Sequence, residues 1–343
     1  MKALVLRDYR KLVYQDVEDP VPADDEVLVR IKACGICGSD VHGWDGSTGR
    51  RIPPLIMGHE AAGVIVAVGR NVRNWRIGER VTFDSTVYRL DDWYTRRGRY
   101  NLSDGRRVLG VSTPEYRRNG AFAELLNVPQ HILYRLPENV SFEQAALVEP
   151  FAVAFHAVRL TPLELGEAVV VVGAGVIGLC LIRALRLRGC GSIWAVDIDA
   201  SRLHLAREFG ADQAFLAEDP ALFESIRAQT EGRGADAAFE AVGISSSFQT
   251  AVACVRRGAT ITLVGNLAQK IDLPLQAVVT QELRLQGSCA IAGEYPAVLA
   301  KLASGDLLAD RLISVCAPLA EGAAWFERLH RKEPGLLKVV LFP

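Results

Sequence analysis

A glycine-rich turn behind an apolar run, AVVVVGAGVIGL at residues 168–179, constrains the fold of this chain more than any other feature. The four valines predict a buried strand, and the residues after the turn continue as an amphipathic helix. Gly173, Gly175 and Gly178 form a G-x-G-x-x-G pattern around Val176 and Ile177. The first glycine permits the tight turn, the second lets a pyrophosphate approach the backbone, and the third lets the helix pack on the strand. The pattern predicts a dinucleotide site at a helix N-terminus, with a purely structural turn as the alternative.

An acid follows at the end of the next predicted strand, in SIWAVDID. Asp197 stands 19 residues after Gly178, where a carboxylate can accept hydrogen bonds from both adenosine ribose hydroxyls and repels the 2′-phosphate of NADP. NAD is therefore the predicted cofactor, while Arg202 nearby keeps NADP open. Further strand-and-helix units follow up to about residue 288, so the predicted class is α/β with a doubly wound parallel sheet.

The preceding part of the chain has a different pattern. Short β-like runs separated by Gly and Pro continue to about residue 150 and predict a mostly antiparallel, barrel-like domain. A chain of 343 residues is too long for one ordinary core, which also favours two domains. The closing strand KVVLFP is expected to return to the first domain.

Charge and hydropathy exclude several classes of function. The net charge of −1 gives no electrostatic footprint for nucleic acid or an anionic membrane. No apolar run reaches the roughly 18 residues of a membrane span, and the N-terminus lacks the apolar core of a signal peptide. A cytoplasmic location is the default expectation. The seven scattered cysteines give no disulfide framework and favour reduced thiols, with a metal thiolate as one use of them.

Potential metal ligands gather in KACGICGSDVHGW, IMGHEAAG and LVEP. These segments supply two thiols, two imidazoles and two carboxylates, namely Cys34, Cys37, His42, His59, Glu60 and Glu149. Zinc binds such groups in a tetrahedral shell, and a catalytic zinc keeps one position open for water or substrate. By themselves, a thiol and an imidazole in glycine-rich loops are more often ordinary core or surface residues.

Several motifs in order make the chain resemble the zinc-dependent medium-chain dehydrogenases, and within them the sorbitol (polyol) dehydrogenase branch. These motifs are CGICGSDVH, GHEAAGVIVAVG, GERV, GRYNL, GAFAE, ALVEPFAVAFHAV, VVVVGAGVIGL and KVVLFP. The resemblance implies a GroES-like, mostly β catalytic domain formed by residues 1–152 and 288–343. It implies a Rossmann NAD-binding domain formed by residues 153–287.

The resemblance also implies a set of zinc ligands. Cys37 and His59 match the constant catalytic ligands of the family. Glu60 matches a carboxylate that ligates zinc in some members, and Glu149 matches the third protein ligand or a carboxylate linked to zinc through water. The choice between the two acids stays open, and Cys34 is expected to be structural.

Further roles are implied for the reaction. Zinc acts as a Lewis acid that lowers the pKa of the substrate hydroxyl, and Ser39 matches the hydroxyl that passes the alcohol proton away. His42 is the expected next stop toward solvent, and Asp40 the acid that orients the site. The carbon then gives hydride to a nicotinamide whose neighbours are expected to be Val242, Val264, Gly265 and Ser288.

The segment STVYRLDDWYTRRGRYNLSDGRRVLG, residues 85–110, departs from the family and is called the lobe below. Many relatives carry C-x2-C-x2-C-x7-C there and bind a structural zinc, whereas this chain has Arg89, Asp92, Thr95 and Ser103. Hydroxyl and guanidinium groups do not replace thiolates, so one catalytic zinc and no structural zinc are expected. Surface ion pairs such as Arg89 with Asp92 could hold the lobe, or it could be a mobile loop.

The substrate is less constrained, because the Arg-Tyr pair of animal polyol dehydrogenases is replaced by Ala290 and Ile291. A polyol needs several hydrogen-bond partners. The candidate partners are Trp44, Asp45, Ser47, Arg50, Glu294 and Tyr295. Arg50 and Arg51 could instead hold the phosphate of a hexitol phosphate, although a solvated turn is favoured for GRRIPP.

The predicted function is NAD-dependent oxidation of a secondary alcohol on a polyol, sugar or sugar derivative. The alternatives are a hexitol-phosphate dehydrogenase of the galactitol-1-phosphate type, an amino-alcohol dehydrogenase of the threonine type, and a zinc-free quinone-reductase type, against which the ligand set argues. A non-catalytic nucleotide-binding protein is the alternative from another class. The expected partners are a small-molecule alcohol and, by resemblance, further copies of the chain in a homodimer or homotetramer, with no nucleic acid and no membrane.

Overall fold

The computed structural model describes residues 1–113 and 117–343, which form two compact units. The first unit comprises residues 1–152 and 291–343, and the second comprises residues 153–290. The chain crosses between these units at 152/153 and 290/291, and the domain boundaries expected from the sequence, 152/153 and 287/288, stay predictions. No helix in the described part of the chain is both long and apolar enough to cross a bilayer.

The first unit is built on a seven-stranded sheet whose order is β12-β6-β5-β3-β20-β19, with β11 paired to β3. Its strands are β3 (Glu26–Gly35), β5 (Glu60–Val68), β6 (Arg80–Phe83), β11 (Leu125–Pro129), β12 (Leu133–Arg135), β19 (Ile313–Pro318) and β20 (Lys338–Phe342). Smaller sheets are formed by β1 (Lys2–Asp8), β2 (Lys11–Asp16) and β4 (Leu55–Ile56), by β7 (Thr86–Val87) and β8 (Arg107–Val108), and by β9 (Val111–Ser112) and β10 (Arg117–Arg118). Buried and less buried positions alternate along much of β3, as expected for a strand with one face on a core.

The C-terminal strand β20 returns to the first unit and pairs antiparallel with β3, with Leu341 opposite Cys34 and Val340 opposite Gly35. Strand β5 pairs with the other edge of β3, and Glu60 lies opposite Gly35. Three segments far apart in the sequence therefore meet at the end of β3. The helices of this unit are α1 (Gly38–Trp44), α2 (Phe142–Ala145), α9 (Tyr295–Ala303) and α10 (Gly322–His330), and α3 (Val148–Leu160) runs across the first crossing point.

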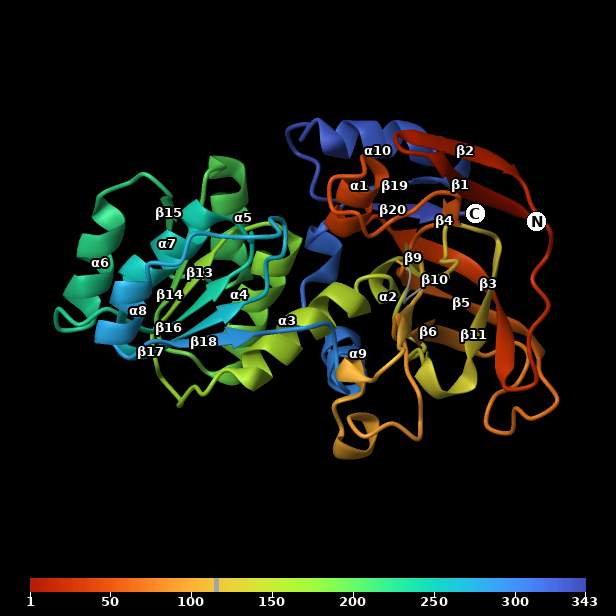
Figure 1. Cartoon of the computed structure of the whole chain (residues 1–343), viewed down its shortest axis with the longest axis horizontal. Helices are drawn as coiled ribbons and strands as arrows, with labels where there is room; N and C mark the ends of the chain where they lie inside the picture. Colours follow the sequence, from red (N-terminus) through yellow and green to blue (C-terminus); the bar gives the residue numbers. More distant parts are fainter. Residues whose placement is uncertain (114–116) are drawn as a thin grey trace. The chain divides into compact units, whose positions relative to one another are not determined.

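The second unit contains a six-stranded parallel sheet in the order β15-β14-β13-β16-β17-β18, wound with helices (Figure 1). The strands are β13 (Val169–Val172), β14 (Ile193–Asp197), β15 (Gln213–Leu216), β16 (Ala235–Glu240), β17 (Val255–Leu263) and β18 (Arg284–Gly287). The helices are α4 (Val176–Arg188), α5 (Ala200–Phe209), α6 (Ala221–Gln229), α7 (Ser245–Cys254) and α8 (Leu275–Thr280). All four valines of β13 are buried, which fits a central strand covered on both faces.

The strand order reverses between β13 and β16, so this sheet has the topological switch point of a Rossmann fold. Ligands of such sheets bind beyond the carboxyl ends of the strands at that point. The predicted class is confirmed in its architecture: a mostly β unit accompanies a doubly wound parallel α/β unit.

Candidate functional site

Three potential metal ligands meet at the end of β3. Cys37 caps the N-terminus of α1, His59 lies just before β5, and Glu60 begins that strand. One ligand atom from each of the three side chains lies within 4.8 Å of the others. Gly35 makes this approach possible, because a Cβ atom there would lie 2.5 Å from Glu60 Oε2. A thiol, an imidazole and a carboxylate at this spacing are a donor set suited to zinc.

A buried lysine faces Glu60, and sequence reasoning missed it. Lys338 Nζ donates to Glu60 Oε2 at 2.6 Å and to the carbonyl of Ile36 at 3.0 Å. The Lys338 and Glu60 side chains are only 2% and 1% exposed, respectively. Burial alone would lower the pKa of Lys338, but the carboxylate of Glu60 outweighs it and raises that pKa. The available signal was a lysine at the head of the closing apolar strand KVVLF.

A second buried cation faces Asp40. Arg51 donates to Asp40 Oδ1 from Nη2 at 2.9 Å and from Nε at 3.2 Å, and both side chains are buried. His59 Nδ1 lies 3.4 Å from the same oxygen. Although burial would raise the pKa of Asp40, His59 and Arg51 lower it to about 2. The expectation that Arg51 belongs to a solvated turn is wrong, because packing carries its side chain inward.

The contact between Asp40 and His59 helps to show whether these residues could bind a zinc ion. A metal-binding histidine commonly presents its second ring nitrogen to a carboxylate, which orients the ring. Here Nδ1 faces Asp40, which leaves Nε2 of His59 for a cation. The neighbouring charges of Asp40 and Cys37 raise the pKa of His59 even though its burial acts in the opposite direction. The residues present therefore fit a zinc ion.

The predicted proton route runs from Ser39 to His42, and in the part of the chain that it describes the structure shows hydrogen bonds of Ser39 alone along it. Ser39 Oγ donates to Cys37 Sγ at 3.3 Å and accepts from Arg51 Nη2 at 3.2 Å. His42 lies half-buried in the same helix α1, and burial lowers its pKa. The bonds of Ser39 lead toward Cys37 and Arg51, so its link with His42 stays a prediction.

Glu149, in the first turn of α3, lies outside the group of three ligand atoms. Glu149 still lies near enough to feel the charges of that group. Burial and the carboxylates of Glu60 and Asp84 raise the pKa of Glu149 to about 7, against the opposing effect of His59. The geometry thus brings Cys37, His59 and Glu60 together and sets Glu149 apart.

Most candidate substrate contacts are occupied within the protein. Trp44 is buried and packs on Phe326 and His330 of α10. Asp45 pairs with His330 Nε2 at 3.1 Å, and Ser47 Oγ donates to the carbonyl of His42 at 2.9 Å. The Tyr295 hydroxyl donates to the carbonyl of Phe83 at 2.8 Å, and Glu294 accepts from the backbone N–H of Ala292 at 2.6 Å. Ile291, at one of the two replaced positions, is fully buried.

The glycine turn of the second unit has the predicted geometry. Gly173 has a φ of +98°, a conformation that favours glycine. A Cβ atom at Gly178 would lie 1.7 Å from the carbonyl oxygen of Gly173, whereas one at Gly175 would meet open space. Gly175 caps the N-terminus of α4 without a side-chain partner, so the first N–H groups of the helix, at Val176 and Ile177, face a site suited to phosphate.

Asp197 ends β14 beside this turn. Its Oδ2 accepts from the N–H of Ala174 at 2.6 Å, and its Oδ1 accepts from the N–H of Asp199 at 3.0 Å. Arg202 lies 3.6 Å from the carboxylate of Asp199, in an ion pair at the N-terminus of α5. The carboxylate of Asp197 is thus held at the turn, while the cation that kept NADP open is paired with an acid.

The expected nicotinamide neighbours all follow the carboxyl ends of strands. Val242 comes after β16, Val264 and Gly265 come after β17, and Ser288 comes after β18. The backbone N–H groups of Val264 and Gly265 both donate to the carbonyl of Glu240 at 2.9 Å, which joins the ends of β16 and β17. The Ser288 hydroxyl is buried and has no partner among the described residues. These residues therefore share the edge of the sheet where a dinucleotide is expected.

The lobe is organised by a carboxylate rather than by ion pairs. Asp92 accepts from the N–H groups of Tyr94 at 2.9 Å, Thr95 at 3.1 Å and Asp104 at 3.3 Å. Ser103 Oγ accepts from the N–H of Arg89 at 3.3 Å. The expected pair of Arg89 with Asp92 is wrong, because Arg89 pairs with exposed Asp91 at 3.2 Å. Asp92 and Ser103 thus tie the backbone at two of the four positions where a structural zinc site is expected to need thiolates.

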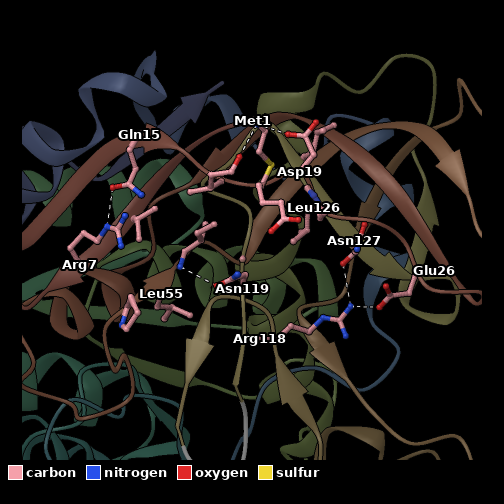
Figure 2. Close-up of a pocket in the computed structure, with 18 residues that line it drawn as sticks. Met1, Arg7, Gln15, Asp19, Glu26, Leu55, Arg118, Asn119, Leu126 and Asn127 are labelled. Atoms are coloured by element: carbon pink, nitrogen blue, oxygen red, sulfur yellow. Dashed lines mark hydrogen bonds and ion pairs between the residues drawn. The ribbon is translucent and has the colours of Figure 1, made fainter.

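A pocket of about 660 Å³ lies elsewhere in the first unit, beside β1, β2, β4 and β11 (Figure 2). Its charged and polar side chains are largely paired with one another. Arg118 contacts Glu26, the Met1 amine contacts Asp19, and Arg7 donates to Gln15 at 2.9 Å. None of the predicted site residues lines it, so the chemistry is assigned to the end of β3 instead.

Comparisons with known proteins agree with this geometry. Residues 23–138 match the alcohol dehydrogenase GroES-like domain, and residues 176–304 match the zinc-binding dehydrogenase domain. A sorbitol dehydrogenase from Bacillus subtilis (strain 168) is 33% identical over 347 residues, covering 100% of this chain and 97% of that protein. The chain belongs to the zinc-binding alcohol dehydrogenase family.

Two solved structures of related dehydrogenases carry cofactors. One, a zinc-binding dehydrogenase from Sinorhizobium meliloti 1021 with NADP bound, has a TM-score of 0.88 and 29% identity, covering 100% of this chain and 99% of that chain. The other, an alcohol dehydrogenase from Escherichia coli CFT073 in complex with NADH, has a TM-score of 0.91 and 29% identity with the same coverage. Membership in this family makes the chain a zinc-dependent alcohol or polyol dehydrogenase.

Proposed function

We propose that this dehydrogenase oxidises a secondary alcohol of an unphosphorylated polyol, sugar or sugar derivative to the ketone. A hydride passes from the carbinol carbon to NAD, and the hydroxyl proton leaves, so the products are the ketone, NADH and one proton. The observation that carries the proposal is the meeting of Cys37, His59 and Glu60, with Ser39 bonded to the thiol. The similarity to a sorbitol dehydrogenase supports the substrate class.

Cys37 and His59 would hold one zinc ion, completed by a carboxylate. The geometry favours Glu60 over Glu149 for that place, because Glu60 alone of the two lies within the group of ligand atoms. Zinc supplies Lewis acidity that makes a hydroxyl group easier to deprotonate. Ser39 would accept and pass on the proton, Asp40 holds the ring of His59, and Arg51 holds Asp40 and the Ser39 hydroxyl. We expect no second zinc, since the lobe lacks the thiolates that a structural site needs.

NAD is proposed over NADP. The carboxylate of Asp197 is fixed beside the glycine turn by two backbone N–H groups, in a position to bind the adenosine ribose hydroxyls. A 2′-phosphate there would meet this negative charge. The structure with NADP and the structure with NADH both come from relatives, so the choice in this chain depends on its own residues.

The hexitol-phosphate alternative is disfavoured by the place of Arg51. A phosphate-binding arginine needs a free guanidinium fork, whereas this one is buried and bonded to Asp40 and Ser39. Arg50, the other arginine of the GRR turn, is exposed. No observation on the described residues favours the amino-alcohol alternative.

We infer a homodimer, or a tetramer built from such dimers, through strand β18. This strand ends the six-stranded sheet and pairs with β17 alone within it. Apolar side chains on β18 and the preceding helix are exposed, namely Leu275, Val279 and Leu285. An exposed strand edge beside apolar side chains favours pairing with a second copy, which light scattering of the purified protein tests.

A substrate screen tests the catalytic proposal. NADH formation is followed over hexitols, hexitol phosphates, inositols and amino alcohols, with NADP tested in parallel. We expect turnover of at least one unphosphorylated polyol with NAD. Preference for a phosphate ester would favour the alternative substrate class. Binding of NADH without turnover of any compound would favour a non-catalytic nucleotide-binding role.

A further inference from the structure

The hydroxyl of Tyr100 joins the lobe to a segment far away in the sequence. It donates to Asp84 Oδ2 at 2.7 Å and accepts from the backbone N–H of Gly293 at 2.8 Å. Asp84 is fully buried, and its Oδ1 accepts from the N–H of Thr86 at 2.8 Å. Figure 1 shows the lobe, drawn in orange, near the beginning of α9, which follows Gly293. The three groups form a continuous chain from a carboxylate through a phenol to the backbone.

The ring of Tyr100 is also held in place. It stacks on Tyr88 with ring centroids 4.3 Å apart, and Tyr88 meets the edge of His131 at 4.9 Å. The backbone on either side of Tyr100 is tied by Asp92, which accepts from the N–H groups of Tyr94, Thr95 and Asp104. The stacking on its face and the two hydrogen bonds at its hydroxyl together hold the Tyr100 side chain in place.

Gly293 belongs to the segment through which the chain leaves the second unit and enters the first. Ser288 lies at the carboxyl end of β18, the crossing point is at 290/291, and α9 begins at Tyr295. Two anchors fix the part of this segment that lies in the first unit. Gly293 is bonded to Tyr100, and the Tyr295 hydroxyl donates to the carbonyl of Phe83 at 2.8 Å. Both anchors lead to the end of β6: Tyr295 bonds directly to Phe83, and Gly293 is linked through Tyr100 to Asp84, the residue after the strand.

We propose that Tyr100 is a positioning residue, whose Asp84-held hydroxyl fixes the backbone at Gly293 and so keeps residues 291–294, which lead into α9, in the arrangement that turnover needs. The inference rests on the proposed function, because it ties the backbone at Gly293 to the turnover of an alcohol. The lobe then supports this segment through Tyr100. The lobe itself is held by the backbone hydrogen bonds to Asp92, with no metal ion involved.

Tyr100 can have this effect because two buried or backbone groups, the carboxylate of Asp84 and the N–H of Gly293, share its hydroxyl oxygen as their partner. Removing it leaves the N–H of Gly293 without this acceptor and takes one donor from the buried carboxylate of Asp84. The segment then relaxes. A displacement of about 1 Å in a group that positions a substrate can cost about a hundredfold in rate.

Tyr100→Phe tests the proposal, with Tyr88→Phe as the matched control. The control removes a hydroxyl from the other ring of the same stack and leaves the bonds to Asp84 and Gly293 intact. Hydrogen–deuterium exchange of peptides covering residues 288–296 is measured first. We expect at least about tenfold faster exchange at Gly293 in Tyr100→Phe and exchange like that of the unmutated chain in Tyr88→Phe.

Steady-state kinetics follows on the same three proteins. For Tyr100→Phe, kcat/KM for the best alcohol from the screen should fall by about tenfold or more, while NADH affinity and zinc content stay within twofold. Unchanged exchange, or faster exchange with unchanged kcat/KM, overturns the proposal. A fall in kcat/KM without faster exchange overturns it too. If the unmutated chain oxidises no alcohol, the proposed function fails, and the exchange data still decide whether Tyr100 fixes Gly293.

Discussion

Lys338 Nζ lies 2.6 Å from Glu60 Oε2, and neither side chain is more than 2% exposed. The pair joins the last strand of the chain, β20, to β5, which begins at Glu60 directly after His59. Removing one member of a buried ion pair leaves an uncompensated charge. We expect Lys338→Met to lower the free energy of unfolding by about 3–5 kcal/mol, as measured by urea denaturation.

The double variant Lys338→Met with Glu60→Gln is the control for that measurement. It removes both charges together, so we expect it to be more stable than Lys338→Met alone. Equal stability of the single and double variants would show that the lost charge balance is not the cause.

Metal analysis tests the ligand assignment. We expect about one zinc per chain in the purified protein, and close to none in Cys37→Ser, because a hydroxyl is a poor substitute for a thiolate ligand. Cys316→Ser is the matched control, since Cys316 is an exposed thiol on β19. Two zinc ions per chain would contradict the account of the lobe, and retention of zinc in Cys37→Ser would contradict the proposed site.

Cofactor preference depends on one carboxylate. In Asp197→Ala, the acceptors for the ribose hydroxyls and the repulsion of a 2′-phosphate disappear together. We expect kcat/KM with NAD to fall by about tenfold or more, and the ratio of kcat/KM with NAD to kcat/KM with NADP to fall as well. The ratio is an internal control, because a general loosening of the glycine turn affects both cofactors. An unchanged ratio would place the discrimination elsewhere.

The lobe should depend on Asp92 and not on its neighbour. Asp92→Ala removes the acceptor for three backbone N–H groups, whereas Asp91→Ala removes one exposed ion pair with Arg89. Limited proteolysis, with cleavage sites mapped by mass spectrometry, should show several-fold faster cutting within residues 85–110 for Asp92→Ala. Cutting of Asp91→Ala should match the unmutated chain, since exposed pairs contribute little. Equal rates for the two variants would contradict the role given to Asp92.

Asp84 predicts a pH dependence of stability. Burial raises the pKa of this carboxyl from 3.8 to about 6 against the opposing hydrogen bonds from Thr86 and Tyr100. The folded chain therefore binds the proton more tightly than the unfolded chain, and stability falls as pH rises from about 4 to about 6. Two pKa units correspond to about 3 kcal/mol. Glu149, whose pKa is raised to about 7, adds a fall in the same direction.

Comparing the unmutated chain with Asp84→Asn isolates the contribution of Asp84. Urea denaturation at pH 4.5 and at pH 7 should show a smaller loss of stability in the variant. Parallel losses in both proteins would mean that Asp84 titrates near its ordinary pKa.

Local patterns predicted much of this architecture because their physical causes are local. Gly173 and Gly178 are required by the turn and by helix packing that their own neighbours impose, and the structure shows both. The alternation of strand and helix after residue 168 predicted the parallel sheet. Cys37, His59 and Glu60 came from short motifs, and the structure brings the three together, while their role as ligands stays a prediction.

The sequence failed where one side chain had to be paired with another distant one. The sequence favours a solvated turn for Arg51, and it gives Lys338 no role beyond its place in the closing strand. Both are buried opposite acids of the candidate site. Arg89 was paired with Asp92 on proximity alone, yet its partner is Asp91, because the carboxylate of Asp92 is taken up by backbone N–H groups.

Helix, strand and turn preferences act over a few residues, so the sequence was enough to predict the two kinds of domain, the nucleotide turn and the set of possible ligands. Which charges and hydroxyls meet could be seen only in the folded chain. Lys338 and Glu60 are 278 residues apart, and Tyr100 and Gly293 are 193 residues apart. Strand pairing and core packing bring such groups into contact, and no local pattern encodes which distant partner a buried charge will find.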